Sequence, residues 1–318
     1  MNVTEMMTAG GGRRFSFEVL PPLKGAGTDR LFSTIDKLCE YSPLFINITT
    51  HHSEYVYHER EDGAIERARV RRRPGTVAVA AAIQHRYGIP VIPHVICSGT
   101  TVEDIEYELI DLQLLDITTL LLLRGDKARE DKRFTPTAGG HAHTTDLIRQ
   151  VARFNDGRFA DGSTFICTHP FTFGVACYPE KHEEAPNIEM DMRYLKEKQD
   201  LGATFAVTQL FYDNDKYFAF VAKARASGIT IPIIPALKPF AKLSQLTVVP
   251  KTFHCDIPDA LAREALKCKS DDEAKALGIE WAESQCRDLY DHGVTNIHFY
   301  TVSAVDAVAE VARRLIKR

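Results

Sequence analysis

The sequence predicts an α/β fold: a single closed (β/α)8 TIM barrel over residues 1–318, with extra helices after its seventh strand. Short apolar runs rich in β-branched and aromatic residues recur eight times, and amphipathic segments alternate with them. The length of 318 residues is also one that α/β barrels fill as one domain. An open, doubly wound sheet would show the same alternation, so periodicity leaves that alternative open.

The eight apolar runs have the composition of parallel strands that are buried on both faces, because they are almost continuously hydrophobic. Eight is also the number of strands that closes this kind of barrel. The expected strands cover residues 15–20, 45–50, 91–97, 118–123, 173–178, 205–211, 231–236 and 296–301.

The segments between these runs predict helices with recognisable ends. Thr28 can cap the first helix, and Gly88 followed by Ile89-Pro90 ends the second. The expected helices cover residues 29–41, 76–87, 102–115, 144–155, 191–201, 215–227 and 303–317.

Several segments depart from this repeat. Residues 1–13 form an N-terminal extension, and residues 51–73 predict a hairpin around Asp62-Gly63. Residues 127–143 form a long polar connection, and residues 242–292 contain extra helices at 258–268 and 271–292. The hairpin and the polar connection follow strands two and four, so we expect them on the catalytic rim of the barrel.

The composition argues against several classes of partner. A net charge of −4 gives no electrostatic reason for binding nucleic acid or an anionic membrane, and no apolar run is long enough to cross a membrane. Seven cysteines without a C-x-x-C pair indicate reduced thiols in a cytoplasmic protein. No metal site is expected, because His51, His52 and His58 lie in the polar hairpin.

Glu18 is the first candidate for chemistry. It lies in an apolar strand that ends at Pro21-Pro22, and burial of a carboxyl group raises its pKa toward neutrality. A raised pKa is the property that a general acid needs. A buried glutamate that pairs with an arginine or a backbone amide is the equally weighted alternative.

Other candidates lie on or after the predicted strands. Arg124-Gly125-Asp126 ends the most apolar strand, and an ordinary strand-ending turn would look the same. His94 on its own is more often a core histidine with satisfied hydrogen bonds. The remaining candidates are Tyr178 and His182 after strand five, Asp191, Tyr194 and Lys198 on one helix face, and Gln209 on strand six.

The helix face from Asp191 can contact a ribose or a diphosphate, or it can be a solvated polar face that Asp191 caps. No G-x-G-x-x-G follows a strand and no Walker A motif is present, so neither a Rossmann site nor a P-loop is predicted.

Taken together and in order, these segments resemble the methylenetetrahydrofolate reductase family. The likeness covers nearly the whole chain from about residue 13 onward. The matching motifs are Phe-Ser-Phe-Glu-x-x-Pro-Pro (15–22), Ile48-Thr49, Pro93-His94, Leu-Arg-Gly-Asp (123–126), Tyr-Pro-Glu-Lys-His-x-Glu-Ala (178–185), Leu-Lys-x-Lys-Gln-Asp-x-Gly-Ala (195–203), Thr-Gln-Leu-Phe (208–211), Ile-Ile-Pro (233–235) and His-Phe-Tyr-Thr (298–301).

The resemblance implies a bacterial-type, single-domain enzyme that binds FAD without a Rossmann fold. It implies a ping-pong reaction with NAD(P)H and methylenetetrahydrofolate, and a homo-oligomer. Glu18 then resembles the general acid and Asp126 a carboxylate near the flavin and the pterin, while Gln209 and Tyr300 match substrate contacts. The positions that match FAD contacts are Thr49, His94, Arg124, Gly125, Asp126, Tyr178, His182, Ala185, Asp191 and Lys198.

The chain departs from the family pattern at three places. Leu243, with Phe240 nearby, replaces the phenylalanine that stacks on the nicotinamide. The basic residue expected soon after Tyr300, for the folate glutamate tail, is absent from residues 302–305, and Cys177 replaces a small residue. An electron donor other than NAD(P)H, such as a ferredoxin or a partner flavoprotein, is therefore one alternative. A non-catalytic barrel that serves as a subunit of a complex is the other.

Overall fold

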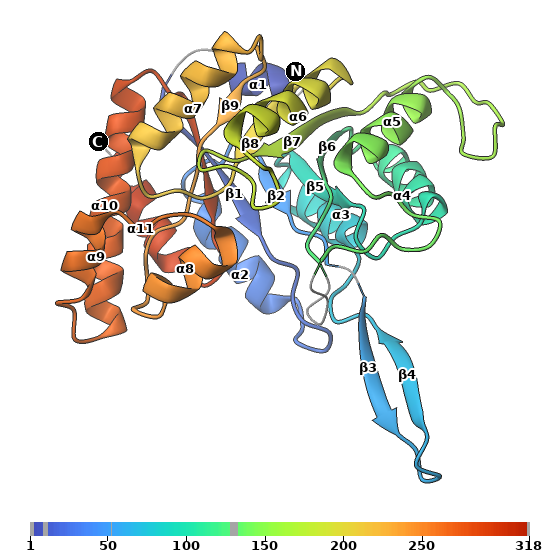
Figure 1. Ribbon diagram of the computed structural model, residues 1–318, viewed down its shortest axis with the longest axis horizontal. Helices are drawn as coiled ribbons and strands as arrows, with labels where there is room; N and C mark the ends of the chain where they lie inside the picture. Colours follow the sequence, from blue (N-terminus) through green and yellow to red (C-terminus); the bar gives the residue numbers. More distant parts are fainter. Residues whose placement is uncertain (1–2, 9–11, 52, 128–132, 317–318) are drawn as a thin grey trace.

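The barrel strands run through the centre of the computed structural model, which describes residues 3–8, 12–51, 53–127 and 133–316 (Figure 1). All neighbouring strands of this sheet are parallel. They are β1 (Arg14–Val19), β2 (Ile46–Ile48), β5 (Val91–Ile96), β6 (Thr119–Leu123), β7 (Thr172–Cys177), β8 (Phe205–Thr208), β9 (Ile233–Ile234), β10 (Ala236–Leu237) and β11 (Asn296–Tyr300).

The seventh predicted strand closes the barrel in two pieces. The strand order is β10-β11-β1-β2-β5-β6-β7-β8-β9, so β9 pairs with β8 while β10 pairs with β11. Pro235 separates the two pieces, since it has no N–H to donate to a ladder, and its carbonyl accepts from the His298 N–H at 2.9 Å. Because β9 and β10 follow each other along the chain, the sheet closes on itself. The predicted closed barrel is confirmed, and the open sheet is wrong.

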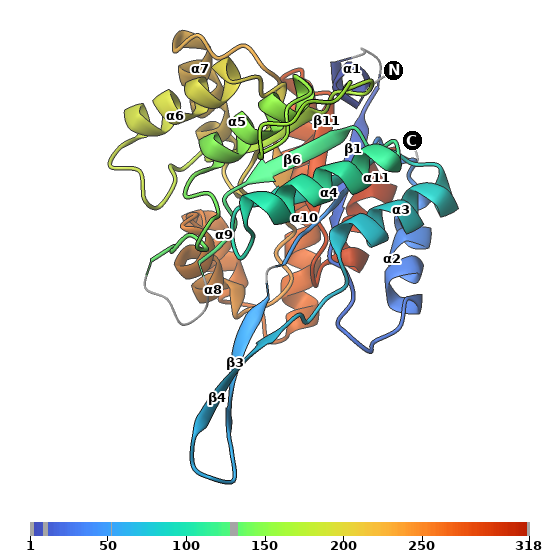
Figure 2. The same ribbon diagram turned by 90° about the vertical axis from the view of Figure 1, so that its right-hand side faces the viewer.

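Helices surround the strands and cover their outer faces (Figures 1 and 2). They are α1 (Val3–Thr8), α2 (Asp29–Cys39), α3 (Thr76–Tyr87), α4 (Val102–Leu114), α5 (Thr144–Asn155), α6 (Ile188–Asp200), α7 (Asn214–Ala226), α8 (Gln245–Phe253), α9 (Asp259–Ala265), α10 (Asp271–Asp291) and α11 (Val305–Ile316). None of the helices in the described ranges is long and apolar enough to cross a membrane.

The capping of two helices differs from the prediction. Thr28 precedes α2, but its side chain makes no capping hydrogen bond. Helix α6 begins three residues before the predicted start at Asp191, because the Asn187 side chain accepts from the N–H of Met190 at 2.8 Å. Asp191 therefore does not cap the helix, and its carboxylate is available for other contacts.

Helix α8 was not predicted. Val248, Val249 and Pro250 all lower helix propensity, and Pro250 lies inside the helix. Val249 is fully buried in a cluster that α8, α9 and α10 share, so tertiary packing outweighs the local preference. The two predicted extra helices after the seventh strand are confirmed as α9 and α10.

The barrel interior contains an apolar cluster of its own. Phe45, Ile92, Leu121 and Phe205 point inward from four different strands or strand starts, and Met7 of α1 packs into the same cluster. Gly174 on β7 makes room for this packing, since a Cβ there would lie 2.1 Å from the Phe205 ring. This apolar cluster fills part of the barrel interior.

The hairpin predicted around Asp62-Gly63 is confirmed. Its strands β3 (Glu54–Glu59) and β4 (Ile65–Val70) pair antiparallel and project away from the barrel in both views (Figures 1 and 2). Gly63 adopts φ +76° in the turn, a conformation that glycine reaches without strain. Tyr57 and Ile65 are 61% and 72% exposed, so the hairpin tip adds nothing to the core.

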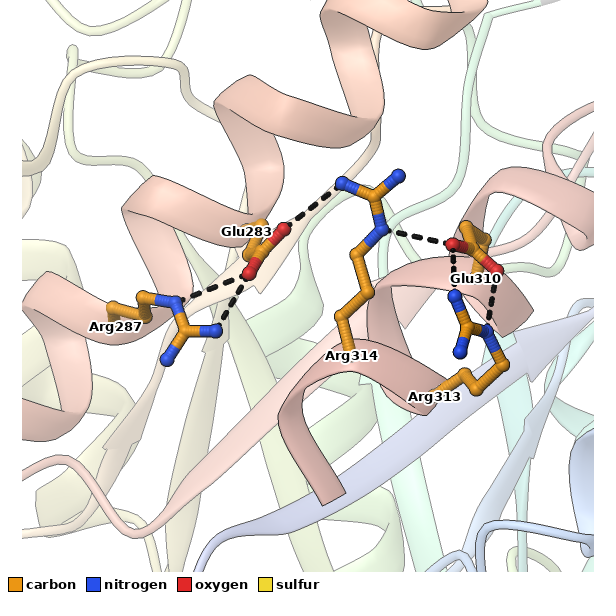
Figure 3. A network of polar contacts seen from close by, with 5 residues as sticks. All are labelled: Glu283, Arg287, Glu310, Arg313 and Arg314. Atoms are coloured by element: carbon orange, nitrogen blue, oxygen red, sulfur yellow. Dashed lines mark hydrogen bonds and ion pairs between the residues drawn. The ribbon is translucent and has the colours of Figure 1, made fainter. Parts of the chain in front are cut away.

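An ion network links α10 to α11 on the outside of the barrel (Figure 3). Glu283 accepts from Arg287 at 2.6 Å and from Arg314 at 3.0 Å, while Glu310 accepts from Arg313 and Arg314. These bonds lower the pKa of Glu310 to about 2. Each solvent-facing pair of this kind stabilises a fold by about 1 kcal/mol or less.

Candidate active site

Glu18 occupies the last part of β1 with its side chain inside the barrel. Its neighbours Phe17 and Val19 pack outward against the helices, and strand alternation turns Glu18 inward. The residue is 8% exposed, and burial raises the pKa of its carboxyl group to about 8. Glu18 is therefore protonated at neutral pH, as the sequence predicts for a general acid. No arginine or backbone amide in the described part of the chain bonds to it.

His94 on β5 faces Glu18 across the interior, and its Nε2 lies 3.5 Å from Glu18 Oε2. Burial lowers the pKa of His94 to about 3, helped by the neighbouring His51, so the imidazole is neutral. Among the described residues, nothing forms a hydrogen bond with this buried Nε2. The interpretation of His94 as a core histidine with satisfied hydrogen bonds is therefore wrong.

Tyr300 lies on β11, next to the strand that carries Glu18, and Gln209 directly follows β8. Tyr300 pairs with Glu18 in the β1–β11 register, and its hydroxyl donates to the Thr208 carbonyl at 2.8 Å. The side-chain oxygen of Gln209 accepts from the N–H of Leu210 at 2.9 Å. Its NH2 group has no acceptor in the described part of the chain, so it can donate to a ligand.

Lys238 is a residue near the acid that the sequence did not identify. It follows β10 directly and is partly buried, and its ammonium interacts electrostatically with the Glu18 carboxyl. A single lysine after a short apolar strand carries no motif, so only the three-dimensional pairing of β10, β11 and β1 reveals it. We call Glu18, His94, Lys238 and Tyr300 the acid side of the site.

Arg124, Gly125 and Asp126 follow β6, the strand that pairs with β5. Gly125 adopts φ +81°, and a Cβ there would lie 2.8 Å from the Cβ of Ser98, so this turn requires glycine. Arg124 forms an ion pair with Glu184. The Asp126 side chain is exposed at the rim, and its backbone carbonyl accepts from the Ser98 hydroxyl at 2.8 Å. The segment is thus a constrained turn beside an open surface.

The segment after β7 packs against this turn. The rings of Tyr178 and His182 meet edge to face with centroids 4.6 Å apart. The backbone N–H of His182 donates to Asp191 Oδ2 at 2.9 Å. The Glu184 N–H donates to His182 Nδ1 at 3.2 Å, which places the ring proton on Nε2. Burial lowers the pKa of His182, as does nearby Arg124. Ala185, in the same segment, is also buried.

Helix α6 contributes a charged pair to the same place. Lys198 donates to the Ala176 carbonyl at 3.3 Å, and burial lowers the pKa of its ammonium while Asp191 raises it. Tyr194, predicted on the same helix face, is 43% exposed. Arg124, Tyr178, His182, Asp191 and Lys198 form the cation side of the site.

Thr49 lies between the two sides, just after β2. Its hydroxyl and the Nε2 of His51 are 3.3 Å apart, and its carbonyl accepts from the Thr76 hydroxyl at 3.3 Å. His52 falls outside the described residues. The described residues contain no group of three or more histidine, cysteine or acidic side chains that could hold a metal ion.

The predicted site residues therefore assemble around one end of the barrel. The acid side offers a proton on Glu18, with a neutral imidazole and a phenol beside it. The cation side offers two positively charged groups and a turn that only glycine can form. Such an arrangement can hold an anionic ligand on one side and transfer a proton on the other.

Comparison with known proteins gives the same family over nearly the whole chain. The family model described as methylenetetrahydrofolate reductase matches residues 4–316. Methylenetetrahydrofolate reductase (NADH) 1 of Arabidopsis thaliana is 30% identical over 307 residues, which cover 93% of this chain and 47% of that protein. Methylenetetrahydrofolate reductase 1 of Schizosaccharomyces pombe is 31% identical and covers 95% of this chain and 45% of its own length. The chain thus spans about half the length of these two relatives.

A bacterial relative is matched over most of its length. The 5,10-methylenetetrahydrofolate reductase of Escherichia coli K12 is 27% identical, and the match covers 92% of this chain and 86% of that protein. Among solved structures, an uncharacterized protein from Clostridium thermocellum that binds two copies of 5-methyl-5,6,7,8-tetrahydrofolic acid has the same fold, with a TM-score of 0.58 and 13% identity over 98% of both chains. Because the family model matches nearly every residue, the chain belongs to the methylenetetrahydrofolate reductase family.

Proposed function

We propose that this chain reduces 5,10-methylenetetrahydrofolate to 5-methyltetrahydrofolate, with FAD as cofactor and NAD(P)H as electron donor in a ping-pong cycle. The observation that carries the proposal is Glu18, a buried carboxyl group that keeps its proton up to about pH 8 at the rim of this family's barrel. The names of the plant and bacterial relatives support the same reaction.

The proton chemistry follows from the substrate. Converting a 5,10-methylene bridge into a 5-methyl group breaks the bond between the methylene carbon and N10. The bond pair remains on N10, which takes a proton, and the methylene carbon becomes an iminium with N5 that accepts a hydride. Glu18 can donate that proton because its acid form persists at neutral pH. The neutral His94 beside it does not compete as an acid, since its pKa lies near 3.

The residues of the cation side fit an FAD molecule. Lys198 and Arg124 can offset the charge of a diphosphate, and the Asp191 carboxylate can accept from a hydroxyl group. The turn at Gly125 lets a ligand approach the backbone closely. We assign Thr49, His94, Asp126, Tyr178, His182 and Ala185 to the same cofactor site. When bound, the flavin supplies the hydride acceptor and donor that links NAD(P)H oxidation to folate reduction.

Substrate recognition is assigned to Gln209, Asp126 and Tyr300. The NH2 group of Gln209, which bonds to no acceptor among the described residues, suits an acceptor on a heterocycle or a carboxamide. The Asp126 carboxylate can accept from ring N–H groups. The Tyr300 hydroxyl already donates to a backbone carbonyl, so it can only accept from a substrate. Such a small number of polar side chains is consistent with one binding face that NAD(P)H and methylenetetrahydrofolate use in turn.

One observation favours a second candidate, folate reduction with a different electron donor. Phe240 is fully buried in the cluster formed by α8, α9 and α10, so it does not stack on a nicotinamide. Leu243 packs against the same cluster. A ferredoxin or a partner flavoprotein would not need such a stacking residue.

The two candidates are separated by anaerobic half-reactions of the purified protein loaded with FAD. Stopped-flow absorbance would follow flavin reduction by NADH, NADPH and reduced ferredoxin in three separate series, and reoxidation by methylenetetrahydrofolate in a fourth. We expect fast reduction by one of the pyridine nucleotides and reoxidation by the folate. Reduction by ferredoxin alone would favour the second candidate. A colourless protein that takes up no FAD would refute both and support a non-catalytic barrel.

A further inference from the structure

Lys238 points into the barrel at the level of the acid. Ala236 of β10 belongs to the interior cluster, whereas Leu237 packs outward against the helices. Because successive side chains of a strand alternate between its two faces, Lys238 is directed inward like Ala236. It is the first residue after β10, so its side chain belongs to the rim.

The strand register brings Lys238 into one row with Glu18. Leu237 pairs with Phe299 in the β10–β11 ladder, so the next residue, Lys238, comes level with Tyr300. Tyr300 in turn pairs with Glu18 in the β1–β11 ladder. Lys238, Tyr300 and Glu18 therefore lie side by side on three adjacent strands with their side chains on the same face.

The backbone that carries Lys238 is fixed by close packing. Pro239 and Phe240, the next two residues, are buried. Helix α10 lies directly on this segment, since a Cβ at Gly278 would come within 1.6 Å of the Phe240 carbonyl oxygen. The anchor of the ammonium therefore does not move freely relative to Glu18.

The charged surroundings of Glu18 single out Lys238. Of the titratable groups that face Glu18, His94 of β5 is neutral, and burial raises the pKa of Tyr300 of β11 far above its usual range. The Lys238 ammonium lowers the pKa of Glu18 against the larger effect of burial, and Glu18 in turn raises the pKa of Lys238. Among the described residues, Lys238 is the cation that acts on the acid.

We propose that Lys238 is a positioning residue that stabilises the Glu18 carboxylate left behind when Glu18 gives its proton to the folate. This inference rests on the proposed function, because it names the partner of the proton donor in that reaction. A buried carboxylate without a compensating charge is costly, and a nearby ammonium reduces that cost. Lys238 thereby makes Glu18 a stronger acid than burial alone would allow.

The step balances without a further reagent. The O–H bond of Glu18 breaks as the N10–H bond forms, and the electron pair of the broken carbon–nitrogen bond stays on N10. The carboxylate then lies beside the Lys238 ammonium until solvent returns a proton to it. The lysine itself stays protonated throughout, so its role is electrostatic and does not require a second proton transfer.

The first test is the pH profile of flavin reoxidation by methylenetetrahydrofolate. Glu18 works in its acid form, so the rate falls as pH rises through its pKa. Lys238→Met should slow this half-reaction and move the fall to higher pH by about one unit or more. Lys238→Arg keeps the charge and should restore the profile. Lys242→Met removes an exposed cation from the same loop and should leave the profile unchanged.

The second test titrates Glu18 without turnover. Infrared difference spectra would follow the carboxylic acid C=O band that disappears in Glu18→Gln, in parent protein and in Lys238→Met. We expect its midpoint to rise in Lys238→Met and to stay near the parent value in Lys242→Met. Coincident midpoints in the parent and Lys238→Met would overturn the inference. Failure of the folate to reoxidise the parent flavin would instead overturn the proposed function and leave this titration intact.

Discussion

The acid side and the cation side of the site treat charge in opposite ways. On the cation side each charged group has a partner: Arg124 pairs with Glu184, Asp191 accepts from the His182 N–H, and Lys198 donates to a carbonyl. On the acid side Glu18 is kept uncharged by burial, and the buried Nε2 of His94 has no hydrogen-bond partner within the described ranges. Paired charges suit a ligand that stays bound, whereas a neutral buried acid with one cation beside it suits a proton that must leave.

The largest expected effect breaks the acid side alone. Glu18→Gln preserves the shape of the side chain and removes its proton, so reoxidation of the flavin by methylenetetrahydrofolate should slow by roughly a hundredfold to ten-thousandfold. Flavin reduction by the electron donor should be retained, because the cation side is untouched. Stopped-flow measurement of each half-reaction checks this. Equal loss of both would refute the general-acid role of Glu18.

A smaller effect is expected from the cation side. Lys198→Met removes an ammonium assigned to the cofactor, so FAD should bind about tenfold to a hundredfold more weakly. Titration of the apoprotein with FAD, followed by fluorescence, gives the dissociation constant. Both half-reactions should then fall together at low FAD and recover when FAD is added in excess.

Lys196→Met is the matched control for this prediction. Lys196 is on the same helix but forms an ion pair with Asp200 away from the site. Its replacement should leave FAD affinity unchanged. If Lys196→Met and Lys198→Met weakened binding equally, the loss would be due to helix α6 rather than to a cofactor contact.

A further expected effect concerns stability and comes from the acid side again. The pKa of Glu18 is about 8 in the folded protein and near 4.5 in an unfolded chain. Between these values the folded state holds a proton that the unfolded state has lost, so stability falls as pH rises, by up to about 1.4 kcal/mol per pH unit. Thermal unfolding of parent and Glu18→Gln from pH 5 to pH 8 should show a widening advantage for Glu18→Gln.

Glu310→Gln on the outer ion network provides the opposite sign. The pKa of Glu310 is lowered to about 2, so its contribution is present above pH 4.5 and is lost only as pH falls toward 2. Its difference in melting temperature from the parent should stay constant between pH 5 and pH 8. A constant difference for Glu18→Gln over the same range would contradict the raised pKa of Glu18.

Much of the barrel could be predicted because each strand is recognisable from its own apolar residues. The continuous apolar runs gave eight strand positions, and Asp62-Gly63 gave the hairpin. Periodicity alone could not separate the closed barrel from an open sheet, since closure depends on pairing between β10 and β11 and between β8 and β9. Helix α8 was missed because its stability comes from burial of Val249 rather than from helix propensity.

For the site as well, residues could be predicted where the signal lies in their own segment, but not where it depends on pairing between distant strands. Glu18 could be predicted as an acid from its own strand, because an apolar run around a carboxyl group already implies burial. Asp191 was misread as a possible cap, since the capping residue Asn187 lies four positions earlier and outside the apolar pattern. Lys238 could not be found at all, because its partner Glu18 is at the other end of the chain and only the barrel brings them level.

The pairing of β1 with β11 also has a consequence for how the protein folds. The acid side combines Glu18 from the first barrel strand with Lys238 and Tyr300 from the last ones, while the cation side lies within residues 124–198. Contacts between distant parts of a chain form slowly, so we expect pulsed hydrogen exchange to show β6 and β7 protected before β1 and β11 during refolding. On the ribosome, nearly the whole chain must be synthesised before Glu18 can contact Lys238 and Tyr300. A nascent chain that stops before β11 could carry every residue of the cation side and still have no completed acid.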